Sequence, residues 1–302
     1  MTIKNGDELL RECSLCPRKC KVDRLNGDVG FCGAGANVKI ARSDLHFWEE
    51  PCISGEEGSG TVFFSCCNMK CVYCQNYGIS TLNRGKEISV SELAEKFLEL
   101  QERGANNINL VTPTHYIPQI REALSIAKES GLNLPIVYNC GGYESVDALK
   151  LLSGYVDIYM PDMKYYDEKL AIGFSSAPNY FEFAKAAVSE MLSQVGRPQI
   201  DDRGIMRKGV IVRHMMLPGL MFDTKKIIDY LYETYGDDIY ISLMSQYTPM
   251  PNVSEDKRLG RKVSPKCYDA MVEYCVEKGI RNAFIQDGSS ATESFIPDFI
   301  CE

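Results

Sequence analysis

Three closely spaced cysteines have the residue type and the spacing to hold a metal cluster. Cys67, Cys71 and Cys74 form a C-x3-C-x2-C sequence within FSCCNMKCVYCQN, directly after an apolar run at residues 61–64. Three thiolates can bind three corners of a four-iron cluster and leave the fourth iron open to a ligand that the protein does not supply. Because an open metal position marks reactivity, we expect chemistry here rather than three buried thiols. Cys66 gives a different spacing, and we interpret it as a neighbour of the triad.

A second group of cysteines lies near the start of the chain, at Cys13, Cys16, Cys20 and Cys32. Four thiolates can close a tetrahedron, so zinc is the plainest interpretation, and an auxiliary iron–sulfur centre is the alternative. The long spacing after the third cysteine favours zinc or a single iron over a ferredoxin-type loop. Four others are scattered along the chain and are expected to be core or surface thiols: Cys140, Cys267, Cys275 and Cys301.

Composition narrows the class of protein. The chain has 302 residues, and its 33 basic and 41 acidic side chains give a net charge of −8. Without a dense basic cluster, nucleic acid is disfavoured as a partner. No apolar stretch approaches the roughly 20 residues that span a bilayer, and the start MTIKNGDELLREC lacks a signal-peptide pattern, so we expect a cytoplasmic protein. In the reducing cytosol, 13 cysteines indicate metal binding rather than disulfides.

The elements that must position these cysteines alternate between strand-like and helical patterns. Strand-like runs occur at residues 61–64, 107–111, 135–139, 156–160, 209–215, 239–243 and 283–285. Helical patterns occur at residues 91–103, 117–130, 145–152, 179–195, 225–235 and 265–278. Repeated βα units of this kind predict an α/β fold, a partial (open) β/α barrel, with the active site at the carboxyl ends of its strands.

The predicted organisation is an N-terminal Cys-rich metal-binding segment over residues 1–50 and a barrel over residues 51–302. Residues 198–208 are polar and turn-rich, and are expected to form a loop or hairpin. Residues 248–261 contain two prolines and several charges, and are expected to form an irregular loop over the top of the barrel.

Polar residues follow four of the predicted strands. They are Asn139-Cys140 before two glycines, the pair Asp162 and Lys164, the strand residue His214, and Gln246-Tyr247. Each has a plainer interpretation, since a glycine pair can be a simple turn, an acid and a lysine a surface ion pair, and a lone histidine a structural group. If the barrel is correct, these strand ends instead surround the cluster.

Nearly the whole chain resembles the radical S-adenosylmethionine (radical SAM) enzymes. The runs that carry the resemblance are CSLCPRKCKVDRLNGDVGFCGAG, the triad, NINLVTPTHY, VYNCGGYES, DIYMPDMKY, VRHMMLPG and MSQYTP. They are most similar to uncharacterised homologues of the activating enzymes of glycyl radical enzymes such as pyruvate formate-lyase. The resemblance implies a [4Fe-4S] cluster whose open iron is chelated by S-adenosylmethionine. It also implies an aromatic residue near the adenine, here Tyr73.

Further cofactor contacts follow from the same resemblance. A D-x-K motif places contacts at Asp162 and Lys164, a strand-end polar pair at Asn139 and Cys140, and a later strand histidine at His214. Two departures stand out. The G-G-E segment that receives the amino group of the cofactor is replaced by residues 111–115, which leaves Thr112, Thr114 and His115 as acceptors, and Asn139 stands where the activating enzymes have an acid.

The resemblance implies reductive cleavage of S-adenosylmethionine to a 5′-deoxyadenosyl radical that abstracts a hydrogen atom. Its target is a glycine of a glycyl radical enzyme, another peptide or a small molecule, and the electron donor is of the flavodoxin or ferredoxin kind. The alternative from a different class is a zinc-binding interaction module without catalysis, in which both cysteine groups hold zinc.

Overall fold

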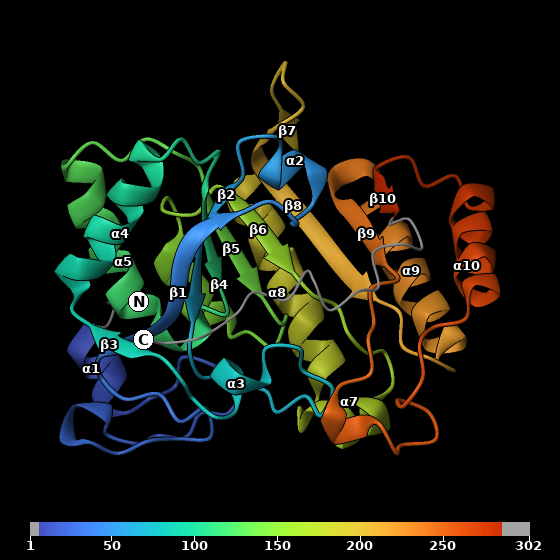
Figure 1. Ribbon diagram of the computed structural model, residues 1–302, viewed down its shortest axis with the longest axis horizontal. Helices are drawn as coiled ribbons and strands as arrows, with labels where there is room; N and C mark the ends of the chain where they lie inside the picture. Colours follow the sequence, from blue (N-terminus) through green and yellow to red (C-terminus); the bar gives the residue numbers. More distant parts are fainter. Residues whose placement is uncertain (1–5, 286–302) are drawn as a thin grey trace.

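The parallel strands of one sheet form the centre of the protein, as a computed structural model of residues 6–285 shows (Figure 1). The strands are β2 (Ser59–Phe64), β4 (Ile108–Val111), β5 (Ile136–Cys140), β6 (Ile158–Pro161), β8 (Met206–Met215), β9 (Tyr240–Met244) and β10 (Ala283–Ile285). Each pairs in parallel with the next in this order. The side chains of β2, β4, β5 and β6 are all buried, as expected for parallel strands that are covered on both faces.

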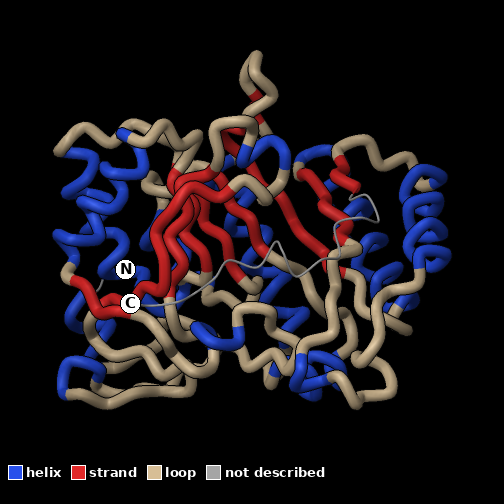
Figure 2. Tube along the Cα trace, in the orientation of Figure 1, coloured by secondary structure: helices blue, strands red, loops and turns tan. Residues whose placement is uncertain are grey.

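Two antiparallel strands extend the sheet on the side of β2. β1 (Val38–His46) pairs with β2, and β3 (Lys86–Ile88) pairs with β1. The sheet runs from β3 at one edge to β10 at the other without closing (Figure 2), which confirms the predicted open barrel. The division at residue 50 stays a prediction, because β1 lies before it and still belongs to the same sheet.

The predicted helices are present and cover the sheet. They are α4 (Val90–Glu102), α5 (Ile117–Glu129), α6 (Val146–Leu149) with a 3-10 turn at Lys150–Leu152, α8 (Tyr180–Val195), α9 (Met221–Tyr235) and α10 (Pro265–Glu277). The start of α4 is fixed by a capping box, in which Ser89 and Glu92 each accept the other's backbone N–H, at 3.1 and 2.7 Å. Gly104, with φ +84°, allows the chain to leave the helix.

Several short elements were not expected from the sequence. They are α1 (Gly6–Arg11), α2 (Pro51–Ser54), α3 (Tyr77–Ser80) and α7 (Glu168–Ser175). The turn-rich residues 198–208 form the predicted hairpin, in which β7 (Gln199–Ile200) pairs with β8. Residues 248–261 are irregular apart from a turn at Pro251–Val253.

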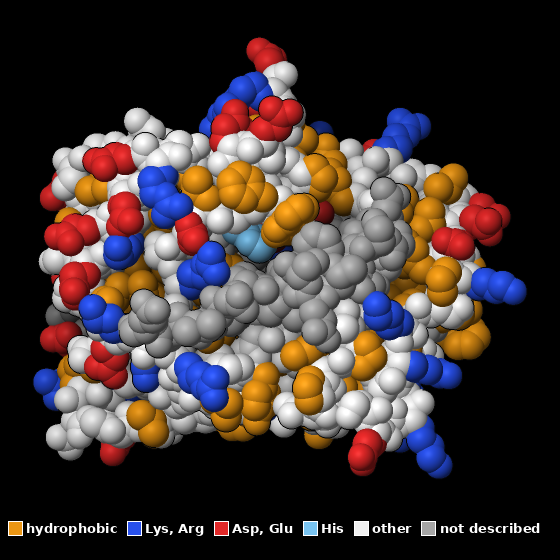
Figure 3. Space-filling model, in the orientation of Figure 1, with side chains coloured by type: hydrophobic (Ala, Val, Ile, Leu, Met, Phe, Trp, Pro, Cys, Tyr) orange, Lys and Arg blue, Asp and Glu red, His pale blue; other side chains and the backbone are white. Residues whose placement is uncertain are grey.

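The carboxyl ends of the parallel strands point to the lower edge of Figure 1, where α3, α7 and the Cys-rich segment lie. On the face shown in Figure 3, acidic and basic side chains of the described residues are interspersed, with hydrophobic side chains between them. Within residues 6–285 no helix is both long enough and apolar enough to cross a membrane. Cys301 lies outside the described residues.

Candidate active site

Residues 65–76 connect β2 to α3 and contain Cys67, Cys71 and Cys74. We call this segment the three-cysteine loop. Cys66 turns its thiol away from the triad: it is buried, and its Sγ accepts a hydrogen bond from the Tyr116 hydroxyl at 3.9 Å. Cys67, Cys71 and Cys74 are half-buried. A φ of +75° at Cys66 produces the change of direction.

Each thiol of the triad has a hydrogen-bond partner. The backbone N–H of Met69 donates to Cys67 Sγ at 3.4 Å, the Ser175 hydroxyl donates to Cys71 Sγ at 2.9 Å, and the Ser80 hydroxyl lies 3.2 Å from Cys74 Sγ. Hydrogen bonds to sulfur stabilise thiolates and tune the potential of an iron–sulfur cluster. These donors therefore suit metal-bound thiolates better than inert core thiols.

Burial opposes ionisation at the triad. Burial raises the pKa of Cys71 to about 11, and it also raises the pKa values of Cys67 and Cys74, while the Lys164 ammonium acts in the opposite direction on all three. Thiols in such a place become thiolates when a metal binds them. Among the described residues, no three Cys, His, Asp or Glu side chains are grouped to hold a single ion. In a [4Fe-4S] cluster each cysteine binds a different iron, so three cysteine ligands do not have to meet at one ion. The donor set therefore fits such a cluster.

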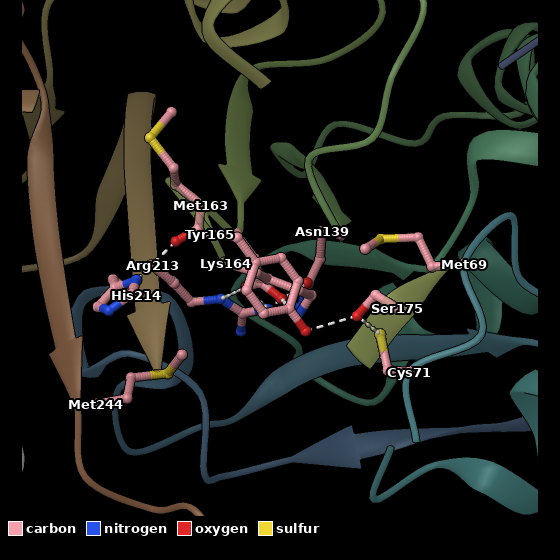
Figure 4. Close-up of polar contacts among 12 residues, drawn as sticks. Met69, Cys71, Asn139, Met163, Lys164, Tyr165, Ser175, Arg213, His214 and Met244 are labelled. Carbon is pink, nitrogen blue, oxygen red and sulfur yellow. Dashed lines mark hydrogen bonds and ion pairs between the residues drawn. The ribbon is translucent and has the colours of Figure 1, made fainter. Parts of the chain in front are cut away.

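The end of α7 holds the loop from the opposite side. The backbone N–H groups of Lys70 and Val72 donate to the carbonyls of Ser175 and Phe174, at 3.1 and 2.9 Å. The Tyr165 hydroxyl lies 2.6 Å from Ser175 Oγ, and Figure 4 shows this contact continuing to Cys71. The hydroxyl of Tyr73 lies 2.5 Å from that of Tyr165. The loop is thus fixed at its middle by α7.

A cavity opens beside the loop, at the carboxyl ends of the strands. The predicted site residues that line it are Cys71, Tyr73, Cys74, Asn139, Asp162 and Lys164, and residues not predicted from the sequence line it too, among them Glu49, Arg213 and Met244. Asn139 is the penultimate residue of β5, Asp162 follows β6, and Arg213 lies in β8, so neighbouring strands bring them to one place.

Charged side chains in the cavity form one connected network. Arg213 pairs with Asp162 at 2.9 Å and with Glu49 at 3.1 Å, and its guanidinium also donates to the Asn139 oxygen at 2.7 Å. Lys164 Nζ lies 2.5 Å from the other oxygen of Asp162. The Asn139 amide donates to Glu49 at 3.1 Å. Two cations therefore offset two carboxylates in a site where these charged side chains are at most 17% exposed.

Asp162 and Lys164 keep their charges at neutral pH. Burial alone raises the pKa of Asp162, but the adjacent Lys164 and Arg213 outweigh it and hold that pKa below its usual value. Burial likewise acts to lower the pKa of Lys164, and the Asp162 carboxylate reverses this, so that the Lys164 pKa is raised. The cavity thus presents fixed positive and negative groups to a ligand that carries both signs.

Four predicted contacts are buried outside the cavity lining, and Thr112 also lies outside it. His214 follows Arg213 in β8 and points to the other face, where its Nδ1 lies 2.7 Å from the Met163 carbonyl (Figure 4). Its Nε2 lies 2.9 Å from the Thr224 hydroxyl. Strand alternation explains this placement, because successive side chains point to opposite faces. The other three are also buried outside the lining: Cys140, Thr114 and His115.

Each of these three has a partner of its own. Thr114 donates to Glu144 at 2.7 Å, and Cys140 hydrogen-bonds to the same carboxyl. Burial raises the pKa of Glu144 to about 7, and these hydrogen bonds act in the opposite direction. His115 Nε2 lies 2.7 Å from the Ser65 carbonyl. These contacts hold the three side chains outside the cavity lining, and a contact with the cofactor stays a prediction.

Thr112 stays a candidate for a different reason. It follows β4 directly with φ +60°, a left-handed conformation that is rare for a β-branched residue, and its N–H donates to the Asn139 carbonyl at 2.8 Å. Strain of this kind concentrates at functional sites. A Cβ on Gly142 would lie 2.1 Å from the Asp162 carbonyl oxygen. Gly142 therefore lets the segments that follow β5 and β6 approach each other.

The N-terminal cysteines are gathered in one folded segment. Cys16 and Cys32 are buried, Cys13 and Cys20 are half-buried, and the backbone of Cys13 is hydrogen-bonded to Lys21 and Val22 at 2.9 and 3.1 Å. Gly30 has no room for a side chain, because a Cβ would lie 2.9 Å from Cys20 Sγ. Burial raises the pKa of Cys16 to about 12. Within residues 6–285 these cysteines, like the triad, are not grouped closely enough to hold a single metal ion, so metal binding here stays a prediction.

Sequence reasoning missed Glu49, Arg213 and Ser175. Arg213 stands next to His214 in the sequence, and alternation along β8 meant that only one of the two faces the cavity. Glu49 reaches the site from the segment between β1 and α2, and Ser175 from the end of α7, elements that the sequence pattern did not predict.

Known proteins resemble this chain in sequence and in fold. A family model described as the radical SAM superfamily matches residues 61–231. An uncharacterized protein of Methanocaldococcus jannaschii is 28% identical over 274 residues, which cover 87% of this chain and 74% of the relative. The pyruvate formate-lyase-activating enzyme of Clostridium pasteurianum is 29% identical over 119 residues, 35% of this chain and 46% of that enzyme.

Two solved structures share the fold. SuiB of Streptococcus suis, bound to the precursor peptide SuiA, gives a TM-score of 0.50 at 13% identity over 73% of this chain and 46% of SuiB. HydG, a maturase of the [FeFe]-hydrogenase, gives 0.52 at 17% identity over 76% of this chain and 52% of HydG. The chain thus spans about half the length of these structures, and identities this low show the fold alone.

Proposed function

The chain belongs to the radical SAM superfamily, and from that premise we propose that residues 67–74 and the adjoining cavity bind a [4Fe-4S] cluster and S-adenosylmethionine. When bound, the reduced cluster would pass one electron to S-adenosylmethionine, whose cleavage would give methionine and a 5′-deoxyadenosyl radical that removes a hydrogen atom from a substrate. The observation that carries this proposal is the arrangement of three hydrogen-bonded cysteines beside a cavity with fixed charges of both signs.

The residues of this chain have separate tasks in that reaction. Cys67, Cys71 and Cys74 hold three irons, and Ser175 and the Met69 N–H stabilise the thiolates. Lys164 and Arg213 attract the carboxylate of S-adenosylmethionine, and Asp162 and Glu49 keep both cations in place. Tyr73 lines the cavity as the aromatic wall for the adenine. Asn139 orients Arg213, and the strained backbone at Thr112 is our candidate acceptor for the amino group.

A glycine of a partner protein is the first candidate substrate. Support comes from the partial similarity to a pyruvate formate-lyase-activating enzyme. The second candidate is another peptide or a small molecule, which the replacement of the G-G-E segment by residues 111–115 favours. In both cases the electron comes from a low-potential donor of the flavodoxin or ferredoxin kind. The four N-terminal cysteines are proposed to bind zinc or a second iron centre.

Metal analysis separates the enzyme from a zinc-binding interaction module. We expect the anaerobically reconstituted protein to be coloured and to contain iron and sulfide. A variant with Cys67, Cys71 and Cys74 all changed to Ala should lose about four irons per chain, whereas Cys267→Ala, at an exposed position, should keep the wild-type content. A colourless wild-type protein that contains only zinc would contradict the proposal.

A further inference from the structure

Arg18 links the Cys-rich segment to the three-cysteine loop. It lies between Cys16 and Cys20 in the sequence, and its Nε donates to the Asn68 carbonyl at 3.0 Å. A terminal nitrogen of the same guanidinium donates to the carbonyl of Ser176. Asn68 belongs to the loop, between Cys67 and Cys71, and Ser176 is the residue directly after α7. One side chain from a distant segment therefore joins the two walls of the proposed cluster site.

These two carbonyls lie where a short ladder of hydrogen bonds ends. Val72 bonds to Phe174 and Lys70 bonds to Ser175, so the loop and the end of α7 run in opposite directions. The next position of this ladder brings Asn68 opposite Ser176, and there the Arg18 guanidinium bonds to both carbonyls. The planar fork of arginine suits this task, because it holds several donors in fixed directions.

Aromatic rings fix the guanidinium in this position. Its central carbon lies 3.6 Å from the centroid of the Phe31 ring and 5.3 Å from that of Tyr143. The side-chain amide of Asn68 also donates to the backbone carbonyl of Tyr143, at 2.6 Å. A cation over an aromatic face is stabilised by the ring's quadrupole. Arg18 is thus held by the Cys-rich segment on one side and by the βα loop after β5 on the other.

A second arginine anchors the Cys-rich segment to the fold. Arg24 is 1% exposed and donates to the His115 carbonyl at 2.6 Å and, within its own segment, to the Gly35 carbonyl at 2.9 Å. His115 in turn contacts the carbonyl of Ser65, two residues before Cys67. The segment that carries Arg18 therefore has a fixed base.

We propose that Arg18 is a positioning residue for the cluster, and that the Cys-rich segment acts as a clamp on residues 67–74. This rests on the proposed cluster site and adds a determinant that lies outside it. Without the Arg18 guanidinium, the carbonyls of Asn68 and Ser176 lose the donor that they share. The three-cysteine loop then separates from the end of α7, and Cys67 and Cys71 become more exposed. The expected consequence is faster loss of the cluster from a protein that remains folded.

The test compares Arg18→Ala and Arg18→Lys with wild type and with Arg11→Ala, which removes the same charge from an exposed position in the same part of the chain. We expect iron loss to an added chelator to be about tenfold faster in Arg18→Ala, as for the loss of charge-assisted hydrogen bonds. Arg18→Lys should not restore retention, because an ammonium lacks the fork. The electron paramagnetic resonance spectrum of the reduced cluster should broaden in both variants, while each variant still unfolds in one cooperative transition.

A second readout needs no iron. In the full-length apoprotein, Cys67 and Cys71 should be alkylated about tenfold faster in Arg18→Ala than in wild type, with exposed Cys267 as the internal reference. If Arg18→Ala does not fold, Phe31→Leu takes its place, because it removes the ring under the guanidinium and keeps an apolar side chain. Equal alkylation and equal iron retention in the variants and wild type would overturn the clamp. A wild type that takes up no iron would overturn the proposed function while the alkylation result still decides on the clamp.

Discussion

At the scale of single residues, the cavity depends on which of two neighbouring side chains faces inward. Arg213 and His214 are adjacent in β8, yet Arg213 joins the charge network and His214 packs on the opposite face. A histidine attracts attention in a sequence because its charge changes near neutral pH. The side that it faces depends on strand register, here the bridge between Asp162 and Arg213, which composition does not reveal.

Lys164 is expected to matter for the cofactor and not for the metal. Lys164→Ala removes a buried cation from the cavity and leaves the three cysteines intact, so the dissociation constant for S-adenosylmethionine should rise about tenfold or more with unchanged iron content. Titration calorimetry with S-adenosylmethionine measures this dissociation constant for the reconstituted wild type and for the reconstituted variant. Lys169→Ala, at an exposed position, is the matched control. Equal affinity in wild type and Lys164→Ala would refute the contact.

His214 should give the protein a dependence of stability on pH. Burial lowers its pKa to about 4, so the folded state keeps it neutral while the unfolded state binds a proton below about pH 6.5. Stability from this group is therefore lost as the pH falls. Relative to His214→Asn, wild type should lose about 1.4 kcal/mol between pH 7.5 and 5.5, seen as a narrowing gap between the two melting temperatures. A gap that is constant with pH would show that His214 is not buried as a neutral group.

At the scale of elements, the apolar runs were sufficient to predict the parallel strands and the long helices. β10 has the predicted bounds, and α4 begins and ends within one residue of its expected position. The short elements were missed because they carry weak patterns. β1 alternates little, since only its first and third residues are fully buried, and α7 has eight residues in a segment that also contains polar turns. Both omissions hid site residues, because Glu49 follows β1 and Ser175 ends α7.

The end of β4 stores strain that a substitution can release. Thr112 has φ +60°, which costs on the order of 1–3 kcal/mol for a residue of this type. Thr112→Gly should therefore raise the melting temperature or leave it unchanged, while weakening the binding of S-adenosylmethionine if the strain serves the cofactor. Asn179→Gly, at another left-handed position that asparagine tolerates, should leave cofactor affinity unchanged. Lower stability together with unchanged affinity in Thr112→Gly would remove Thr112 from the site.

At the scale of the whole molecule, one open sheet brings distant segments to a single edge. Residues from the β1–α2 connection, the loop after β2, and the ends of β5, β6, β8 and β9 meet around the cavity, although they are spread over some two thirds of the chain. The cysteine spacing predicted the position of the centre of this site, because its ligands are local in sequence. The charge network could not be predicted in full, because its members become neighbours only through the order and register of the strands.

The central claim is that this arrangement cleaves S-adenosylmethionine reductively, and product analysis tests it most directly. The anaerobically reconstituted protein is incubated with a strong low-potential reductant and S-adenosylmethionine, and 5′-deoxyadenosine and methionine are quantified by chromatography and mass spectrometry. We predict that wild type forms both products, and that Cys71→Ala, which lacks one ligand of the proposed cluster, forms neither. Iron-loaded wild type that forms no 5′-deoxyadenosine, or a Cys71→Ala variant that forms as much as wild type, would contradict the account.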